Sequence, residues 1–247
     1  HDIFEDSTED TQEFAFSRAV AFSFTGIILS FIFFHIAARF AFFSDLSATG
    51  QLLIGQIPFV GGGTGCALLG LRKSLQEHGW RKVLDMPAAF PCPKYLFYRT
   101  LIKYTLFLVS CSILLNALSC ILLEAAGFHN LPKQILEIYG SDAGFSFWTV
   151  AFIIAVVVAP VAEEILFRRV LYQGLKNLNI SHAGLVTALL FSLCHALPQA
   201  FLSYIFFSLI LQKACNKGNL WMAIALHAGF NFVMLAMLIV KIFFFSA

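Results

Sequence analysis

The stretch WTVAFIIAVVVAPVAEEILFRR, residues 148–169, decides the fold. It opens with an apolar run of the kind that builds a membrane-spanning helix, for which about 20 such residues are needed. The run continues through Pro160 into paired glutamates, Glu163 and Glu164, and then Arg168 and Arg169. The stretch therefore predicts a transmembrane helix with charges at one end.

The rest of the chain has the same apolar character. Hydrophobic residues make up 59% of its 247 residues and charged residues only 12%, against about 25% charged residues in an ordinary soluble domain. This composition excludes a disordered protein and argues against a soluble enzyme, because too little polar surface is available to cover the outside. The net charge of +2 predicts no basic face for nucleic acid.

Working outward from residues 148–169, we find further apolar segments on both sides. They predict an all-α fold, a polytopic bundle of transmembrane helices with about seven to eight spans. We expect one integral membrane domain over residues 1–247. The segments run approximately over 18–42, 51–71, 101–126, 147–175, 183–197, 198–212 and 220–246. Pro198 separates the fifth segment from the sixth, which are either two short helices or one broken unit.

The distribution of Lys and Arg predicts the orientation. These residues concentrate in the connector 72–103, after the fourth segment and before the last, whereas only Arg39, Lys133 and Lys241 fall on the other side. Because cytoplasmic loops carry the excess of positive charge, we expect the N-terminus in the cytoplasm and the protein in the cytoplasmic (inner) membrane.

Two other stretches carry local predictions. Residues 72–90 are basic with interspersed apolar side chains, and they predict either an amphipathic helix on the inner leaflet or a plain loop. Residues 61–65, GGGTG, lack the Gly-Lys-Ser/Thr of a phosphate loop. We expect them to allow close helix packing or a kink near Pro58.

Polar side chains recur inside the last segments, where lipid should be. Ionisable groups inside a span are costly and mark function by default. At a rise of about 1.5 Å per residue, those of the fourth, fifth and last segments fall in one layer, part-way into the bilayer from the cytoplasmic side. The residues of this layer are Glu163, His195, His227 and Asn231.

The spacings of the motif residues indicate which side chains can lie together. Glu164 and Arg168 stand four residues apart, so they share a helix face and can form an ion pair. That pair would fix the rotation of the helix and direct Glu163 elsewhere. His227 and Asn231 have the same spacing, so both side chains can point into one cavity.

A carboxylate, two imidazoles and a carboxamide suit the hydrolysis of an amide by water. Glu163 could act as general base on that water, with His195 orienting it or sharing the proton. His227 and Asn231 could donate hydrogen bonds to the developing oxyanion. Alternatively, Glu163, His195 and His227 could hold a divalent metal such as zinc, as in a metalloprotease. The metal-free site explains the carboxamide better, because Asn is a poor zinc ligand.

Taken together, Glu163-Glu164-x-x-x-Arg168, Phe191-x-x-x-His195 and His227-x-x-x-Asn231 resemble the three motifs of the CAAX-protease and bacteriocin-processing (CPBP) intramembrane proteases. That family includes the type II CAAX prenyl endopeptidases. The resemblance covers about the last third of the chain, so residues 1–146 would be variable N-terminal spans and residues 147–246 the catalytic helices.

The resemblance implies a role for each motif residue. Glu163 would activate the water together with His195. Glu164 and Arg168 would support the site, while His227 and Asn231 would form the oxyanion hole. It also favours a metal-free site, open to the cytoplasm.

The expected partners are a membrane-associated peptide or a prenylated or lipidated protein as substrate, and the lipid bilayer. Two other classes stay open at this point. One is a catalytically silent membrane binding or immunity protein. The other is a transporter that uses Glu163 and the histidines as a proton relay.

Overall fold

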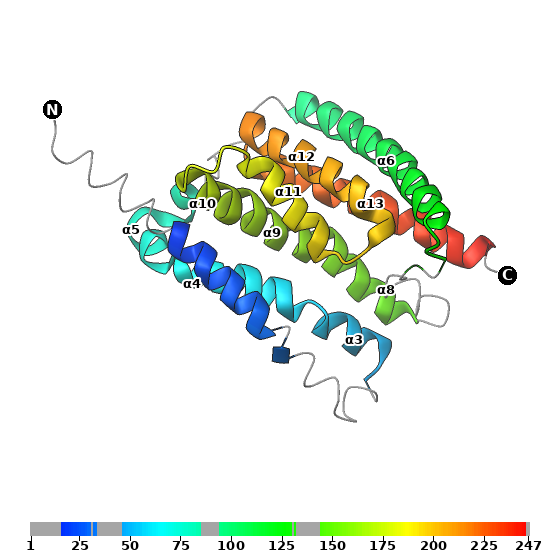
Figure 1. The fold of residues 1–247 in the computed structure, drawn as a ribbon, viewed down its shortest axis with the longest axis horizontal. Coiled ribbons are helices and arrows are strands. Elements are labelled where there is room, and N and C mark those ends of the chain that lie inside the picture. The colour runs from blue at the N-terminus through cyan, green and yellow to red at the C-terminus, as the bar shows by residue number, and fades with distance from the viewer. Residues whose placement is uncertain are drawn as a thin grey trace. The chain divides into compact units, whose positions relative to one another are not determined.

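The computed structural model describes residues 16–30, 32–33, 46–84, 94–129, 131 and 144–245. Every regular element in these ranges is a helix, and they contain no strand (Figure 1), which confirms the all-α prediction. The chain divides into two compact units. The first comprises His1–Ala88 and Val161–Ala183, and the second comprises Ala89–Pro160 and Gly184–Ala247. The single domain over 1–247 stays a prediction.

The first unit is held together by close approaches between helix backbones. It contains the unlabelled blue helix Phe16–Ser30 of Figure 1. It also contains α3 (Ala48–Ile54), η1 (Ile57–Gly65), α4 (Cys66–Gly70), α5 (Arg72–Val83), η4 (Ile165–Leu171) and α10 (Tyr172–Asn177). A side chain at Gly26 would collide with the main-chain oxygen of Gly62, and one at Gly70 with the backbone of Ala19. Small residues permit such contacts between membrane helices, so the predicted packing role of residues 61–65 is confirmed.

Helix α5 settles the alternatives for residues 72–90 as far as residue 84; residues 85–90 lie outside the described part of the chain. Residues Arg72–Val83 are helical, with a break at Gly79, where φ is 76°. Leu75 and Val83 are buried, whereas Trp80 is exposed. The stretch is therefore helical on both sides of Gly79 and not a plain loop. Its position on the inner leaflet stays a prediction.

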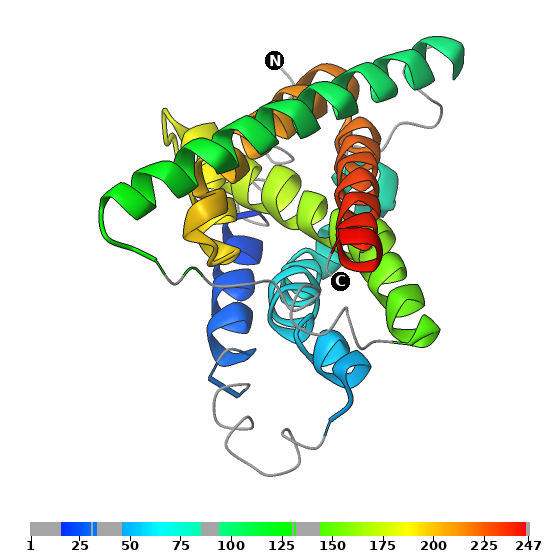
Figure 2. The same cartoon turned by 90° about the vertical axis from the view of Figure 1, so that its right-hand side faces the viewer.

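The second unit is built around one long helix, α6 (Lys94–Ala125). The unit also contains α8 (Phe145–Phe152), η3 (Ile153–Val158), α11 (Ala183–Cys194), η5 (Pro198–Ala200), α12 (Phe201–Gly218) and α13 (Leu220–Phe245). Helix α6 packs against α12 and α13, which it crosses in Figure 2, and α13 also packs against η3. Gly229 makes the α6 contact possible, since an added Cβ there would lie 2.9 Å from the Thr105 hydroxyl.

All seven predicted apolar segments coincide with helices in the described residues. Four of these helices are long and apolar enough to span a membrane by length and composition, namely Ala48–Gly70, Lys94–Ala125, Phe145–Asn177 and Leu220–Phe244. The first segment coincides with the shorter helix Phe16–Ser30, and its residues 34–42 lie outside the described part. The fifth and sixth segments are separate helices, α11 and α12, joined by a turn and η5. The full number of spans stays a prediction.

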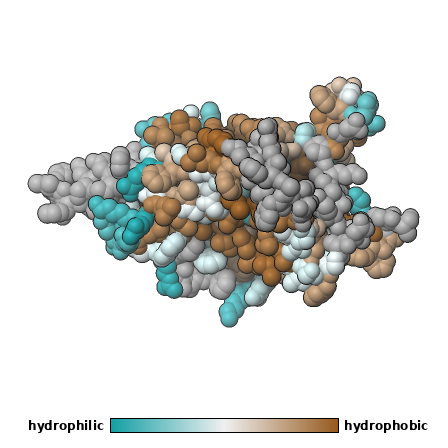
Figure 3. All heavy atoms as spheres, turned by 90° about the horizontal axis from the view of Figure 1, so that it is seen from below, coloured by the Kyte–Doolittle hydropathy of each residue, from teal (hydrophilic) through white to brown (hydrophobic). Residues whose placement is uncertain are grey.

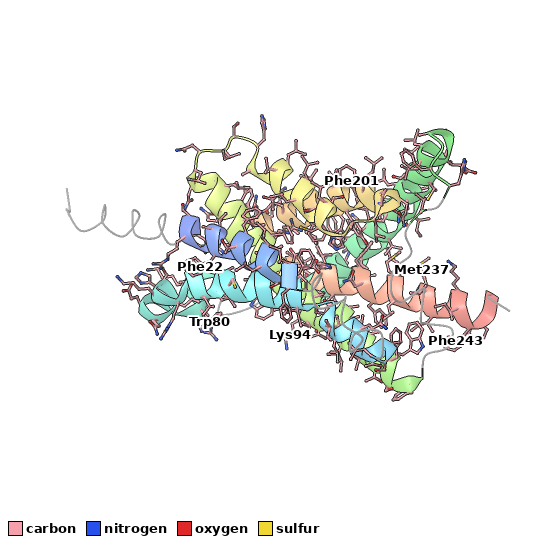
Figure 4. All side chains as sticks on the ribbon, turned by 60° about the horizontal axis from the view of Figure 1, so that its bottom comes forward. Phe22, Trp80, Lys94, Phe201, Met237 and Phe243 are labelled. Carbon is pink, nitrogen blue, oxygen red and sulfur yellow. The ribbon has the colours of Figure 1, made fainter. Side chains whose placement is uncertain are left out.

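Exposed apolar side chains are typical of a protein solvated by lipid. Brown, apolar side chains cover much of the face drawn in Figure 3. Large hydrophobic side chains are exposed in both units, among them Phe22 and Trp80 in the first, and Met237 and Phe243 in the second (Figure 4). In water this would be an aggregation hazard, so the surface agrees with an integral membrane protein.

Candidate active site

The glutamate motif lies where α9 (Ala159–Glu164) passes into the π-helical turn η4. Arg168 Nε donates to Glu164 Oε2 at 2.8 Å, and both side chains are fully buried. The predicted ion pair is therefore confirmed. Two buried charges are tolerated only when they are paired, so the pair fixes the rotation of this helical segment and with it the direction of its neighbour Glu163.

A second contact fixes the same turn from a distant part of the chain. The Thr64 hydroxyl of η1 donates to the main-chain oxygen of Ala162 at 2.8 Å, and this bond is buried. Ala162 directly precedes Glu163, so the hydrogen bond from Thr64 holds the main chain next to Glu163. In the sequence Thr64 is a lone hydroxyl within a glycine-rich apolar segment, a pattern that predicts helix packing but no contact with the glutamate motif.

Arg169, the next residue, contacts a different part of the first unit. Arg169 Nη2 donates to the main-chain oxygen of Val83 at 2.9 Å, and its guanidinium carbon lies 5.8 Å from the centre of the Phe16 ring. Val83 is the last residue of α5, where helix carbonyls lack main-chain donors. Arg168 thus neutralises a carboxylate inside the segment, while Arg169 attaches that segment to the end of α5.

His195 is the histidine of the second motif, and its ring is oriented by its own helix end. The sequence placed it within an apolar segment, whereas α11 ends at Cys194 and His195 begins the following turn. Its Nδ1 lies 2.8 Å from the main-chain oxygen of Phe191. A carbonyl can only accept, so Nδ1 carries a proton, and in the neutral form of such a ring Nε2 has the lone pair. That tautomer suits a base or a ligand.

Aromatic rings surround the two motif histidines in the second unit. His195 lies 4.5 Å from the ring centre of Phe191 and 4.3 Å from that of Tyr204 in α12. His227 lies 6.1 Å from the same Phe191 ring and 5.0 Å from Phe207, edge to face. Phe191 therefore connects the second motif with the third. Tyr204 is a functional candidate that sequence reasoning missed, because a lone Tyr in an apolar helix gives no signal.

Asn231, the last motif residue, has a main-chain partner. Its Nδ2 donates to the oxygen of Ala155 in η3 at 2.8 Å. Because a carbonyl cannot donate, this contact also assigns which end of the carboxamide carries the nitrogen. The NH₂ group has two hydrogens, so one N–H ties α13 to η3 and the second is the one that an oxyanion would use.

The predicted site residues are thus divided between the two units. Glu163, Glu164 and Arg168 lie in the first unit, and His195, His227 and Asn231 lie in the second. Each half is ordered by its own contacts. The convergence of Glu163 with the histidines, and the common depth of these residues in the bilayer, stay predictions.

The metal alternative draws on both halves. Among the described residues, no three His, Cys, Asp or Glu side chains of one unit form a group that could hold a metal ion. The suggested ligands Glu163, His195 and His227 come from different units, so this set stays a prediction. The Nδ1–H contact of His195 fits both chemistries, since metal-binding histidines usually donate their other ring nitrogen in this way.

The comparison with known families bears on all three motifs together. Residues 145–233 match the family described as Rce1-like, type II CAAX prenyl endopeptidase. The matched segment begins at α8 and ends within α13, so it contains all six predicted site residues. It confirms the resemblance to the CAAX-type proteases and supports a protease of the CAAX endopeptidase kind in a membrane. No curated protein and no solved structure matches the chain.

Proposed function

We propose that this chain, with its Rce1-like segment at residues 145–233, is an intramembrane endopeptidase that uses a water activated by Glu163. Its substrate is a membrane-associated peptide or a prenylated or lipidated protein, cut from the cytoplasmic side of the cytoplasmic membrane. The observation that carries this proposal is that one matched segment holds both a glutamate beside a buried ion pair and a histidine with a fixed tautomer.

The reaction begins with a proton transfer from water. The Glu163 carboxylate takes one proton as the water oxygen attacks the carbonyl carbon of the scissile bond. His195, with its proton on Nδ1, presents Nε2 to accept a hydrogen bond from the same water and so orients it. The π bond of the carbonyl opens, and its oxygen becomes an oxyanion.

The oxyanion then needs donors, and the leaving amine needs a proton. His227 and the second N–H of Asn231 donate to the oxyanion, a kind of contact that contributes about 100-fold to 1,000-fold in rate. When the carbonyl re-forms, the C–N bond breaks and the amine takes the proton held by Glu163. The products are a carboxylic acid, which keeps the second proton of the water until solvent takes it, and a free amine. The Glu163 carboxylate is regenerated.

The metal-free form of this mechanism is the one we propose. It uses all the polar motif residues, including a carboxamide that zinc would not favour as a ligand. A chelator gives the test: treatment with 1,10-phenanthroline should leave the cleavage rate unchanged. Loss of activity that returns on adding zinc would instead assign Glu163, His195 and His227 as metal ligands.

Cleavage itself is tested with the full chain reconstituted in liposomes. The probe is a farnesylated peptide with a CAAX tail, and mass spectrometry detects the released tripeptide. Glu163→Ala should lower the rate by about 100-fold to 10,000-fold, the usual contribution of a general base. Glu124→Ala is the matched control, because Glu124 lies exposed at the far end of α6 and should not affect the rate.

Three outcomes would contradict the proposal. Retained cleavage in Glu163→Ala would remove the glutamate from the mechanism. Binding of the peptide without any tripeptide, in the wild-type protein and the variant alike, would favour the silent binding protein. A proton flux that needs Glu163 and occurs without a cleavage product would favour the transporter.

A further inference from the structure

The hydrogen bonds of η3 show an unusual gap directly before the glutamate motif. In this π-helical stretch the Ala159 N–H donates to the oxygen of Ile154, five residues back. In an α-helix the same N–H would donate to Ala155 instead. The π-helical partner of Ala155 would be residue 160, which is a proline and has no N–H. The Ala155 oxygen is therefore left without a donor from its own helix.

A side chain from another helix fills this gap. Asn231 of α13 donates its Nδ2 to the Ala155 oxygen at 2.8 Å, and α13 packs along η3 in the same unit. The contact is part-buried, and a main-chain carbonyl left without a donor is destabilising inside a membrane protein. The proline and the asparagine are thus linked: the first withholds a donor and the second supplies one.

The link has a consequence for the direction of the carboxamide. One N–H of Asn231 is fixed on Ala155, which also fixes the plane of the amide and so the direction of the second N–H. Donors in an oxyanion hole act through such preorganisation, because they need no reorientation as charge develops. If residue 160 carried an N–H, Ala155 could bond within its own helix, and the carboxamide would lose its anchor.

We propose that Pro160 is a positioning residue for hydrolysis, acting through the Ala155 carbonyl to orient the Asn231 carboxamide. This rests on the proposed function, in which Asn231 is an oxyanion donor. Pro160 touches no substrate in this scheme. Its part is to keep the Ala155 oxygen available as the acceptor that holds Asn231.

The test is a double-mutant cycle on the full-length enzyme in liposomes, with kcat and KM measured separately. Asn231→Ala should lower kcat by about 100-fold to 1,000-fold. Pro160→Ala, which restores the N–H, should lower kcat by about 10-fold to 100-fold as a positioning defect, with KM nearly unchanged. Because Pro160 acts through Asn231, the double variant should have the kcat of Asn231→Ala alone.

Thermal stability tests the link between Pro160 and Asn231 independently of catalysis. Asn231→Ala leaves the Ala155 oxygen without a donor, so its Tm should fall by a few degrees in detergent. Adding Pro160→Ala should recover most of that loss. Pro58→Ala is the matched control, since Pro58 stands at the start of the π-helix η1, where no main-chain N–H is needed. Pro58→Ala should leave the wild-type kcat unchanged, and added to Asn231→Ala it should not raise the Tm of that variant.

The outcomes separate the two proposals. Unchanged kcat in Asn231→Ala overturns its oxyanion role, and with it this part of the proposed function, whatever the Tm cycle shows. If Asn231→Ala does lose kcat, three results would overturn the role of Pro160. Pro160→Ala could keep the wild-type kcat, or the kcat losses of the two single variants could multiply in the double variant. The third result is a double variant whose Tm is no higher than that of Asn231→Ala.

Discussion

The two halves of the candidate site are ordered by different forces. In the first unit, Glu163 is positioned through strong polar contacts, the buried Glu164–Arg168 pair and the hydroxyl of Thr64 on the Ala162 oxygen. In the second unit, the histidines sit among aromatic rings, with single hydrogen bonds to main-chain oxygens setting the direction of His195 and Asn231.

This difference suits the proposed chemistry of each half. A carboxylate that receives and returns a proton needs a fixed position, and a rigid charged neighbour provides one. Rings that orient a water or an oxyanion need a defined rotation, and tilted or edge-to-face aromatic contacts restrict rotation without adding charge. We therefore expect disruption of the first half to affect stability as well as rate, and disruption of the second half to affect mainly the rate.

The largest expected effect comes from breaking the buried pair. Arg168→Met leaves the Glu164 carboxylate buried without its guanidinium, so we expect a loss of about 3–5 kcal/mol in the free energy of unfolding. The double variant Glu164→Leu/Arg168→Met should recover most of this loss, because apolar side chains of similar size can replace a buried pair. Thermal unfolding in detergent measures both effects.

The exposed pair on α5 is the matched control for that experiment. Lys73 and Glu77 have the same spacing along a helix, with 3.9 Å between Nζ and Oε1 and both side chains exposed. Lys73→Met should leave the Tm almost unchanged, because solvent screens such pairs. An equally small effect in Arg168→Met would show that the first half is not held by its ion pair, and the comparison of the two halves would fail.

A smaller effect is expected from the aromatic half. Tyr204→Leu removes the ring that lies 4.3 Å from His195, and an aromatic contact of this kind contributes about 0.5–1.5 kcal/mol beyond the area it buries. If that energy holds the ring orientation, kcat falls by about 2-fold to 10-fold. KM should change little, and Tyr204→Phe should keep the wild-type kcat.

Tyr95 offers the control for this substitution. It is an exposed tyrosine near the start of α6, so Tyr95→Leu should keep the wild-type kcat. Two results would count against a positioning role for Tyr204: a rise in KM with kcat unchanged, or a loss in Tyr204→Phe as large as that in Tyr204→Leu. Either would mean that Tyr204 acts on substrate binding or through its hydroxyl.

The sequence predicted the parts of this architecture that are local. Apolar runs gave the helices, and the spacing of four residues gave the Glu164–Arg168 pair, because both follow from the geometry of one helix. The partners of Thr64 and Asn231 could not be predicted in this way, since they lie 98 and 76 residues away along the chain. Such contacts depend on which helices pack together. The pattern of apolar residues along the chain predicts the helices but does not specify which of them are neighbours.

Pro160 and His195 show a second limit. Pro160 and its missing N–H could be read from the sequence. The consequence could not, because it depends on the π-helical hydrogen bonds of η3, in which the Ala159 N–H donates to Ile154 and not to Ala155. Likewise, the apolar run around His195 continued past the true end of α11 at Cys194. Hydrophobicity does not mark a helix end when the following turn is also apolar.

That turn gives the smallest predicted effect. Ala196 follows His195 with a φ of 51°, in the left-handed region that disfavours a Cβ by about 1–2 kcal/mol. Ala196→Gly should remove this strain. After subtracting the added freedom of the unfolded chain, about 0.4–1 kcal/mol, a net stabilisation of up to about 1.6 kcal/mol remains. The matched Ala117→Gly lies in the exposed interior of α6 and should destabilise by about 1 kcal/mol. If the strained turn aims His195, the more stable Ala196→Gly enzyme will be slower than wild type, whereas an unchanged kcat would show that the Nδ1 contact with Phe191 suffices to hold the ring.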